Sequence, residues 1–185
     1  AAERNLLKVI NGVHVTSETT VENLVLAQDV IQTRVSGLLK GAVIVSEKPF
    51  SENGYEVVLA VSLFGEDTAL ARSIDLPARF KQANPEVTIT PPASKTEPKP
   101  EPAVTPAPLP GHYTGLVIDC RGLNLSRSMC PRILDQTGGN LWSTLTVSAD
   151  LVNERGIAGY FASLDDPDLA DRVGKRPLVV KALRV

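Results

Sequence analysis

The sequence predicts an α+β protein, made of two small helix-on-sheet domains joined by a proline-rich extended linker. Nine of the 14 prolines lie between Pro85 and Pro110. On both sides of that stretch, short runs rich in Val, Leu and Ile follow segments with helical spacing. The 185 residues exceed the usual size of one domain and are few for two. We therefore expect domains over residues 1–83 and 112–185, with the linker over residues 84–111.

The prolines of the linker prevent it from forming a helix or a central strand, because proline lacks the backbone N–H donor and clashes with the preceding turn of a helix. A polyproline-like spacer rises about 3.1 Å per residue, so the stretch from Pro85 to Pro110 has a reach of roughly 80 Å.

The N-terminal half begins with two predicted helices. Apolar residues within 6–10 form a short stripe that Asn11-Gly12 ends. A longer helix starts at Val21, where apolar residues follow helical spacing, and Gly37 or Gly41 stops it. Thr19 and Glu22 have the spacing of a capping box at its start.

A hairpin and a short helix complete this half. Residues 42–46 and 55–63 are rich in Val and Leu and predict two strands. Pro49 and Asn53-Gly54 between them are typical of a hairpin connection. Residues 66–72 predict one short helix.

The C-terminal half opens with a predicted strand over residues 114–119. A hairpin is expected from residues 132–135 and 140–142, because Gly138-Gly139 between them tolerates positive φ. Residues 149–154 predict a helix.

Three more elements are expected toward the end of the chain. Residues 157–161 predict a strand. Asp165 or Asp166 with Pro167 is typical of a helix start, so residues 169–173 predict a helix that Gly174 stops. Residues 177–185 predict the final strand.

Composition argues against two classes of protein. The chain has 19 basic and 21 acidic residues and a net charge of −2, whereas a general nucleic-acid binder needs a basic surface. No apolar run approaches the roughly 20 residues that span a bilayer. We therefore expect no nucleic acid among its partners and no transmembrane segment.

The first residues suggest export. Ala1-Ala2 fits the small residues found beside a signal peptidase cleavage site. We expect an exported protein, on the cell surface or associated with the periplasm or outer membrane. The alternative is a trimmed fragment.

Residues 1–65 resemble a known envelope domain. The segments that carry the resemblance are Gly12-Val-His-Val-Thr-Ser-Glu-Thr-Thr-Val-Glu-Asn and Arg34-Val-Ser-Gly, with Lys40-Gly-Ala-Val-Ile-Val and Gly54-Tyr-Glu-Val-Val-Leu after them. They are similar to the N-terminal domain of flagellar assembly protein T and to short outer-membrane lipoproteins, such as that of the flagellar basal disc. The C-terminal half resembles the tails of uncharacterised exported bacterial proteins.

The resemblance implies a helix packed on a small sheet, a role in assembly of envelope rings or discs, and no catalytic residues. It also implies outer-membrane or flagellar components as partners. The chain departs from the lipoproteins because it has no lipidated Cys at its first position.

The two cysteines, Cys120 and Cys130, are candidates for a disulfide that closes a short loop. Such a bond stabilises by about 2–3 kcal/mol in the chain-entropy view. The alternatives are two buried thiols or bonds between subunits.

No pattern in the sequence predicts catalysis, a metal or a cofactor. His14 and His112 do not combine with the cysteines into a zinc spacing. The phosphate-binding glycine loops and the nucleophile elbow are also missing from the sequence. We therefore expect a protein that is not an enzyme, with no metal and no cofactor.

Two apolar segments are candidates for assembly by strand addition. Val87 and Ile89 alternate with Thr88 and Thr90 as in a half-buried strand, outside both expected domains. The alternative is that this segment packs on its own domain. The final strand offers a second set of candidates, Leu178, Val179, Val180 and Leu183.

The sequence therefore predicts a structural subunit that binds copies of itself in a filament, ring or disc of the bacterial envelope or cell surface. Its linker and edge strands would contact neighbours. Two alternatives stay open: a monomeric periplasmic or flagellar adaptor, and a ligand-binding or enzymatic C-terminal module.

Overall fold

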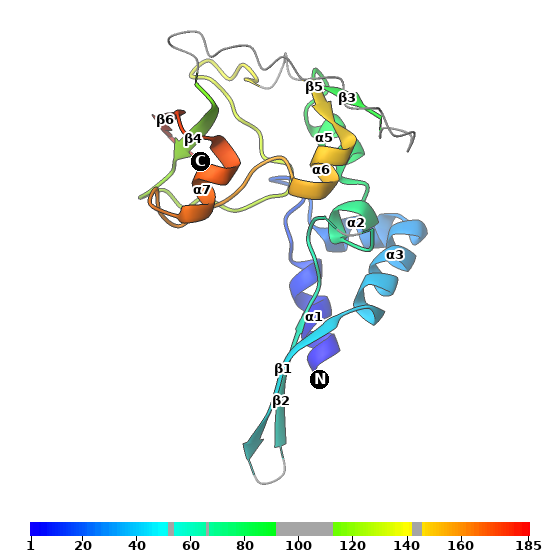
Figure 1. Cartoon of the computed structure of the whole chain (residues 1–185). Coiled ribbons are helices and arrows are strands. Elements are labelled where there is room, and N and C mark those ends of the chain that lie inside the picture. Colours follow the sequence, from blue (N-terminus) through cyan, green and yellow to red (C-terminus); the bar gives the residue numbers. More distant parts are fainter. Residues whose placement is uncertain (52–53, 66, 92–112, 142–145) are drawn as a thin grey trace, which may run out of the picture. The chain divides into compact units, whose positions relative to one another are not determined.

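In a computed structural model the chain is an α+β protein, in which short helices alternate with small sheets (Figure 1). This confirms the predicted fold class. The structure describes residues 1–51, 54–65, 67–91, 113–141 and 146–185. In chain order the elements are α1 (Ala2–Asn11), α2 (Val21–Ala27), α3 (Asp29–Lys40), β1 (Val43–Ser51), β2 (Gly54–Ala60), α4 (Leu70–Ser73), α5 (Leu76–Ala83), β3 (Thr88–Thr90), β4 (Gly115–Asp119), β5 (Thr146–Ser148), α6 (Ala149–Arg155), α7 (Pro167–Val173) and β6 (Pro177–Lys181).

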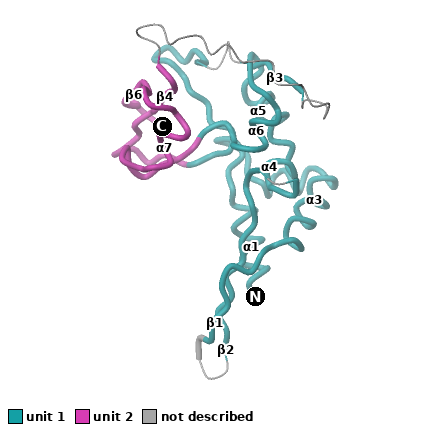
Figure 2. The backbone as a smooth tube through the Cα atoms, in the orientation of Figure 1, with its two compact units in different colours: residues 1–92, 127–158 teal, residues 93–126, 159–185 magenta. Residues whose placement is uncertain are grey.

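The chain forms two compact units, each assembled from two stretches of sequence (Figure 2). Unit 1 joins residues 1–92 with 127–158, and unit 2 joins residues 93–126 with 159–185. Residues 127–158, which we expected in the C-terminal domain, thus pack with the N-terminal half. Most of the expected linker falls on 92–112, outside the described residues. The expected domain boundaries stay a prediction.

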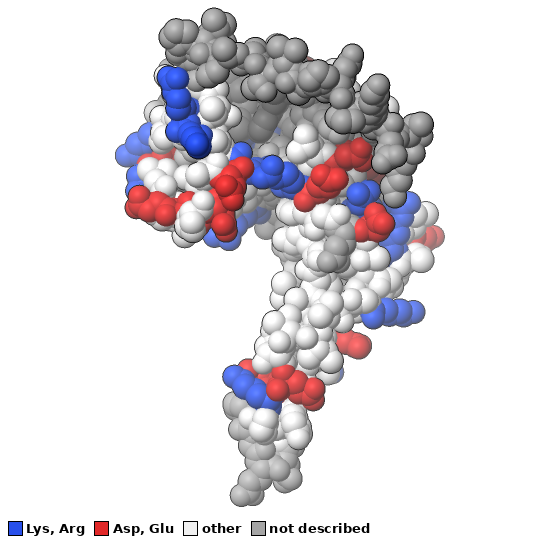
Figure 3. Space-filling view, in the orientation of Figure 1, with Lys and Arg blue, Asp and Glu red and all other residues white. Residues whose placement is uncertain are grey.

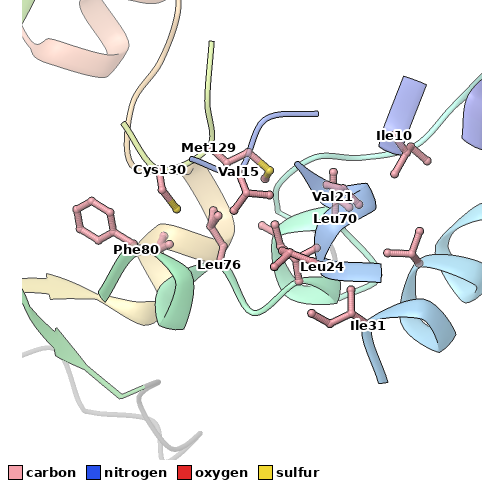
Figure 4. Packing of buried hydrophobic residues seen from close by; sticks show 14 of the residues in the cluster. Ile10, Val15, Val21, Leu24, Ile31, Leu70, Leu76, Phe80, Met129 and Cys130 are labelled. Carbon is pink, nitrogen blue, oxygen red and sulfur yellow. The ribbon is translucent and has the colours of Figure 1, made fainter. Parts of the chain in front are cut away.

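The hydrophobic core of unit 1 collects side chains from helices that are far apart in the sequence (Figure 4). Removing this apolar surface from water is the main stabilising contribution to the unit. Its largest fully buried side chains, at less than 2 % exposure, include those of Phe80, Leu70, Ile74, Leu76, Val15, Val21 and Val35.

Three residues of the later stretch join this core: Met129, Cys130 and Val152. Met129 and Cys130 are buried among the N-terminal side chains. The backbone N–H of Met129 donates to the carbonyl oxygen of His14 at 2.9 Å, and that of Cys130 to the carbonyl oxygen of Val15 at 2.8 Å. These bonds satisfy backbone groups that would otherwise be buried without partners.

The long helix predicted from Val21 is two helices. Gln28 adopts extended backbone angles between α2 and α3, with φ −145° and ψ 111°. Asp29 then starts α3, which ends at Gly41 as predicted. The expected capping box is displaced by one residue. Thr20 is the N-cap of α2, and Asn23 is its reciprocal partner.

Other elements also differ from the prediction. Instead of one helix over residues 66–72, the structure has α4 and a longer α5, which was not predicted from the sequence. Residues 157–161 form no strand, and β6 ends at Lys181 instead of residue 185. The second predicted hairpin is reduced to one bridge between Leu134 and Asn140, and Trp142 lies outside the described residues.

The described sheets have two strands each. In unit 1, β1 and β2 form the predicted antiparallel hairpin, and β3 pairs with β5 in parallel. In unit 2, β4 pairs in parallel with β6, and α7 contacts β4. Asp166 caps α7 through its carboxylate, which accepts from the N–H of Asp168 at 3.0 Å, as a helix N-cap should.

Candidate functional site

Both cysteines are free thiols in the structure. Cys130 is buried in unit 1, and its burial raises the pKa of the thiol to about 12. Burial also raises the pKa of Cys120 in unit 2, and the neighbouring Asp119 carboxylate adds to the shift. Neither thiol is therefore activated as a nucleophile near neutral pH. The expected disulfide stays a prediction.

The first candidate assembly segment, which contains Val87 and Ile89, packs on its own unit, as in the alternative interpretation of its sequence. Val87 is fully buried, and Ile89 is half-buried. Thr88, Ile89 and Thr90 pair with Thr146–Ser148 of β5. The Thr90 hydroxyl also donates to the carbonyl oxygen of Val147 at 3.3 Å. This segment thus buries its apolar side chains within its own unit.

The second candidate segment is exposed. Leu178, Val179 and Val180 lie in β6 with 37, 50 and 44 % of their surface accessible. Successive residues of a strand point to opposite faces of a sheet, so both faces of β6 present apolar side chains to solvent. Leu183, just beyond the strand, is 75 % exposed.

One edge of β6 is paired and the other is open within the described residues. Leu178, Val179 and Val180 lie opposite Leu116, Val117 and Ile118 of β4. No other described strand pairs with β6. Parallel strands usually occur in sheets covered on both faces, and two strands alone are marginally stable. The sheet of β4 and β6 therefore has fewer described strands, and more exposed apolar surface, than is usual for a parallel sheet.

The start of β4 is held firmly to the segment that leads into β6. The Thr114 hydroxyl donates to the carbonyl oxygen of Val173 at 2.7 Å and accepts from the Arg176 N–H at 3.0 Å. The Thr114 N–H donates to the carbonyl oxygen of Arg176 at 2.9 Å. The register of the two strands is thus fixed at one end, and β6 is presented as an ordered edge.

The β1–β2 hairpin of unit 1 is a second exposed sheet. Val43, Ile44 and Val45 of β1 are 65, 59 and 64 % exposed, and Tyr55 of β2 is 72 % exposed. Pro49 in β1 has no N–H to offer a further strand, whereas β2 contains no proline. The edge of β2 is therefore the better acceptor of a new strand.

The two exposed sheets differ in charge. On the hairpin, the charged side chains form one narrow band across a stretch that is otherwise uncharged (Figure 3). Lys48 forms an ion pair with Glu56 at 2.9 Å, and Glu47 forms no ion pair within the described residues. The described side chains of the band therefore carry a net charge of −1. By contrast, four exposed basic residues flank or end β6: Lys175, Arg176, Lys181 and Arg184.

The described residues contain no group of three or more His, Cys, Asp or Glu side chains able to hold a metal ion. None of their helices is both long enough and apolar enough to cross a bilayer. The exported location expected from the sequence stays a prediction.

Comparison with known proteins identifies one similarity. Residues 115–185 match the family model described as Treponema pallidum Tp0624, second domain. The match begins at the first residue of β4 and includes α6, α7 and β6. No curated protein and no solved structure matches the chain.

This finding corrects the resemblance drawn from the sequence. The family that matches is neither that of flagellar assembly protein T nor an outer-membrane lipoprotein family, so the expected resemblance of residues 1–65 is wrong. The motifs behind it were short runs of common Val, Ser, Thr and Gly residues, which recur wherever a capped helix precedes a Val-rich strand.

Proposed function

We propose that the protein is a non-enzymatic structural subunit that associates with copies of itself by strand addition. In this proposal the open edge of β6 in one copy accepts the β2 edge of the hairpin of the next copy. Such a contact joins two different surfaces, so each copy can bind the next one head to tail. The copies form a ring if the rotation between neighbours returns to the first copy, and a filament if it does not.

The observation that carries the proposal is the exposure of β6. Three consecutive apolar side chains, Leu178, Val179 and Val180, are exposed on a strand whose outer edge has no partner among the described strands. Proteins usually protect such edges with prolines, inward charges or bulges, because a bare edge pairs with other chains. In β6 the described proline is at the first position, Pro177, and none of the three residues that follow it is charged.

Charge supports a second copy as the occupant. The hairpin holds an acidic band in which Glu47 forms no ion pair with another described residue, and β6 lies among four exposed basic residues. Complementary charges around an apolar centre favour a specific orientation and speed association. Because both surfaces belong to the same chain, a second copy supplies the matching partner.

The test compares two variants that each replace an exposed aliphatic residue with lysine. Val179→Lys places a charge on β6, and Leu151→Lys places one on α6 at a residue with a similar exposure of 52 %. We expect light scattering and sedimentation to show concentration-dependent association of the original protein. For Val179→Lys we expect the free energy of association to be weaker by about 1.4 kcal/mol, because a charge replaces an apolar contact. This corresponds to a protein concentration about tenfold higher for the same degree of association.

Leu151→Lys should associate like the original protein. A monomer at all accessible concentrations would overturn the proposal. Equal weakening in both variants would also count against it, because the effect would then come from added charge and not from β6.

A further inference from the structure

Unit 1 contains a hollow of about 280 Å³ that strand addition does not use. Its wall is formed by the turn over residues 15–19, by α5 and by Arg132. These three segments are distant in sequence and belong to the same unit. The volume is just below the range for ligand pockets, which begins near roughly 300 Å³. It therefore suits a small molecule.

The turn over residues 15–19 is closed by four hydrogen bonds. The Thr16 hydroxyl oxygen accepts from the N–H groups of Glu18 and Thr19 at 3.2 and 3.1 Å. The carbonyl oxygen of Thr19 accepts from Val15 and Thr16 at 2.8 and 3.1 Å. Ser17 and Thr19 line the hollow, and their hydroxyls form no hydrogen bond within the described part of the chain. They are thus available as donors on a fixed backbone.

Arg79 is held in place from two sides. Its Nε donates to the carbonyl oxygen of Ile74 at 3.2 Å, and its Nη2 donates to Oε1 of Gln28 at 3.1 Å. A guanidinium has five N–H donors in a fixed plane, so these two bonds orient the group and leave others free.

Arg132 is the second arginine that lines the same hollow. It is exposed, and within the described residues it makes no hydrogen bond or ion pair. Among the described residues that line the hollow, Glu18 is the single carboxylate, so these side chains carry one net positive charge. Two guanidiniums beside free hydroxyls form a donor set that matches a carboxylate or phosphate group.

We propose that this hollow binds a small molecule carrying one oxyanion, either a carboxylate or a phosphate group. Arg79 and Arg132 hold the oxyanion, and the hydroxyls of Ser17 and Thr19 donate to it. The Glu18 carboxylate disfavours a second negative group and accepts a hydrogen bond from a hydroxyl or amine elsewhere on the ligand.

The experiment titrates the full chain with sodium phosphate or sodium acetate and follows backbone amide shifts by NMR at constant ionic strength. Sodium chloride is the blank. We expect at least one of the two anions to produce saturable shifts at residues 17–19. Saturation with phosphate alone identifies a phosphate ligand, and saturation with acetate alone identifies a carboxylate ligand.

Two variants with the same loss of charge test the site itself. Arg132→Gln should weaken binding about tenfold, as expected for the loss of a charged hydrogen bond. Arg34→Gln removes an exposed arginine of α3 that does not line the hollow, and it should leave the affinity within about twofold, because distant surface charges are screened. Equal shifts with chloride, or equal affinities of the two variants, would overturn the proposal.

Discussion

The Nδ2 of Asn140 donates a hydrogen bond to Oδ1 of Asn84 at 3.1 Å and joins two segments 56 residues apart. Asn84 has no exposed surface, and its own Nδ2 donates to the carbonyl oxygen of Phe80 at 3.3 Å. Its backbone N–H donates to the same Phe80 oxygen at 2.8 Å, and its carbonyl oxygen accepts from Val87 at 3.0 Å. Through its backbone, Asn84 ends α5 and starts the turn into β3, and its buried side chain connects this turn to Asn140.

Replacing Asn84 by alanine should destabilise unit 1. The substitution removes two side-chain hydrogen bonds at a buried site, and an unsatisfied buried group costs about 1–3 kcal/mol of the free energy of unfolding. The measurement is the midpoint of urea unfolding followed by circular dichroism.

Asn5→Ala is the matched control, because Asn5 is exposed on α1. Alanine favours a helix more than asparagine does, so this variant should be as stable as the original or slightly more stable. Equal unfolding midpoints for the two variants would show that the bond between Asn84 and Asn140 does not stabilise the unit.

The capping box at the start of α2 gives a second prediction. The Asn23 N–H donates to the Thr20 hydroxyl oxygen at 3.4 Å, and the Thr20 N–H donates to Oδ1 of Asn23 at 2.9 Å. Thr20→Ala should lower the free energy of unfolding by about 1 kcal/mol, because one N-terminal amide loses its acceptor. Thr20→Ser keeps the hydroxyl and should restore most of the loss in the same urea experiment. A serine variant as unstable as the alanine variant would attribute the loss to the methyl group instead.

Local signals in the sequence were enough for much of the fold. The hairpin of β1 and β2, the stop of α3 at Gly41 and the cap of α7 at Asp166 depend on neighbouring residues. The hairpin was predicted, and Gly41 and Asp166 were each one of two predicted alternatives, the others being Gly37 and Asp165. The break at Gln28 was not predicted, because no proline or glycine interrupts the apolar spacing of residues 21–39 there. Helix ends of this kind are decided by tertiary packing more than by propensity.

Contacts between distant segments had no local signal. Met129 and His14 share a backbone hydrogen bond across more than a hundred residues, and neither neighbourhood shows a periodicity that predicts it. The exposed edge of β6 was expected from its run of apolar residues. The hollow was not expected, because its lining combines a turn, a helix that was missed and Arg132.

The Asp119 carboxylate should titrate well below its ordinary pKa. Arg121 donates to it from Nε at 2.9 Å, from Nη2 at 2.8 Å and from its backbone N–H at 3.0 Å. These bonds, from the side chain first, lower the pKa of Asp119 from 3.8 to about 2. The ionised form is therefore favoured by folding. Its contribution to stability is fully present above pH 3.8 and is lost as the pH falls toward 2.

Carboxyl NMR titration measures this midpoint directly. In Arg121→Gln the midpoint of Asp119 should rise toward 3.8, because the two guanidinium bonds are removed. The stability difference between the original protein and Asp119→Asn should shrink over the same pH window. A midpoint near 3.8 in the original protein would contradict the bonded geometry.

The start of β4 should not accept a side chain at Gly115. A Cβ built there would lie 2.6 Å from the carbonyl oxygen and 2.8 Å from the Cα of Val173, at the end of α7. Both are backbone atoms, so Gly115→Ala must push α7 away from β4 and strain the Thr114 bond to the same carbonyl. We expect a loss of about 1–3 kcal/mol in the stability of unit 2, as for overpacking in general.

Gly37→Ala is the matched change with the opposite expected sign. Gly37 lies inside α3, and a Cβ there would meet nothing within 4 Å. Alanine should stabilise this helix by about 0.5–1 kcal/mol, because glycine loses more backbone entropy on folding. Calorimetry gives the unfolding transitions, and amide hydrogen exchange at β4 and α3 assigns each change to its unit. Unchanged amide exchange at β4 in Gly115→Ala would contradict this prediction. It would show that α7 moves away from β4 with no loss of stability, and that the pairing of β4 with β6 does not depend on this close packing.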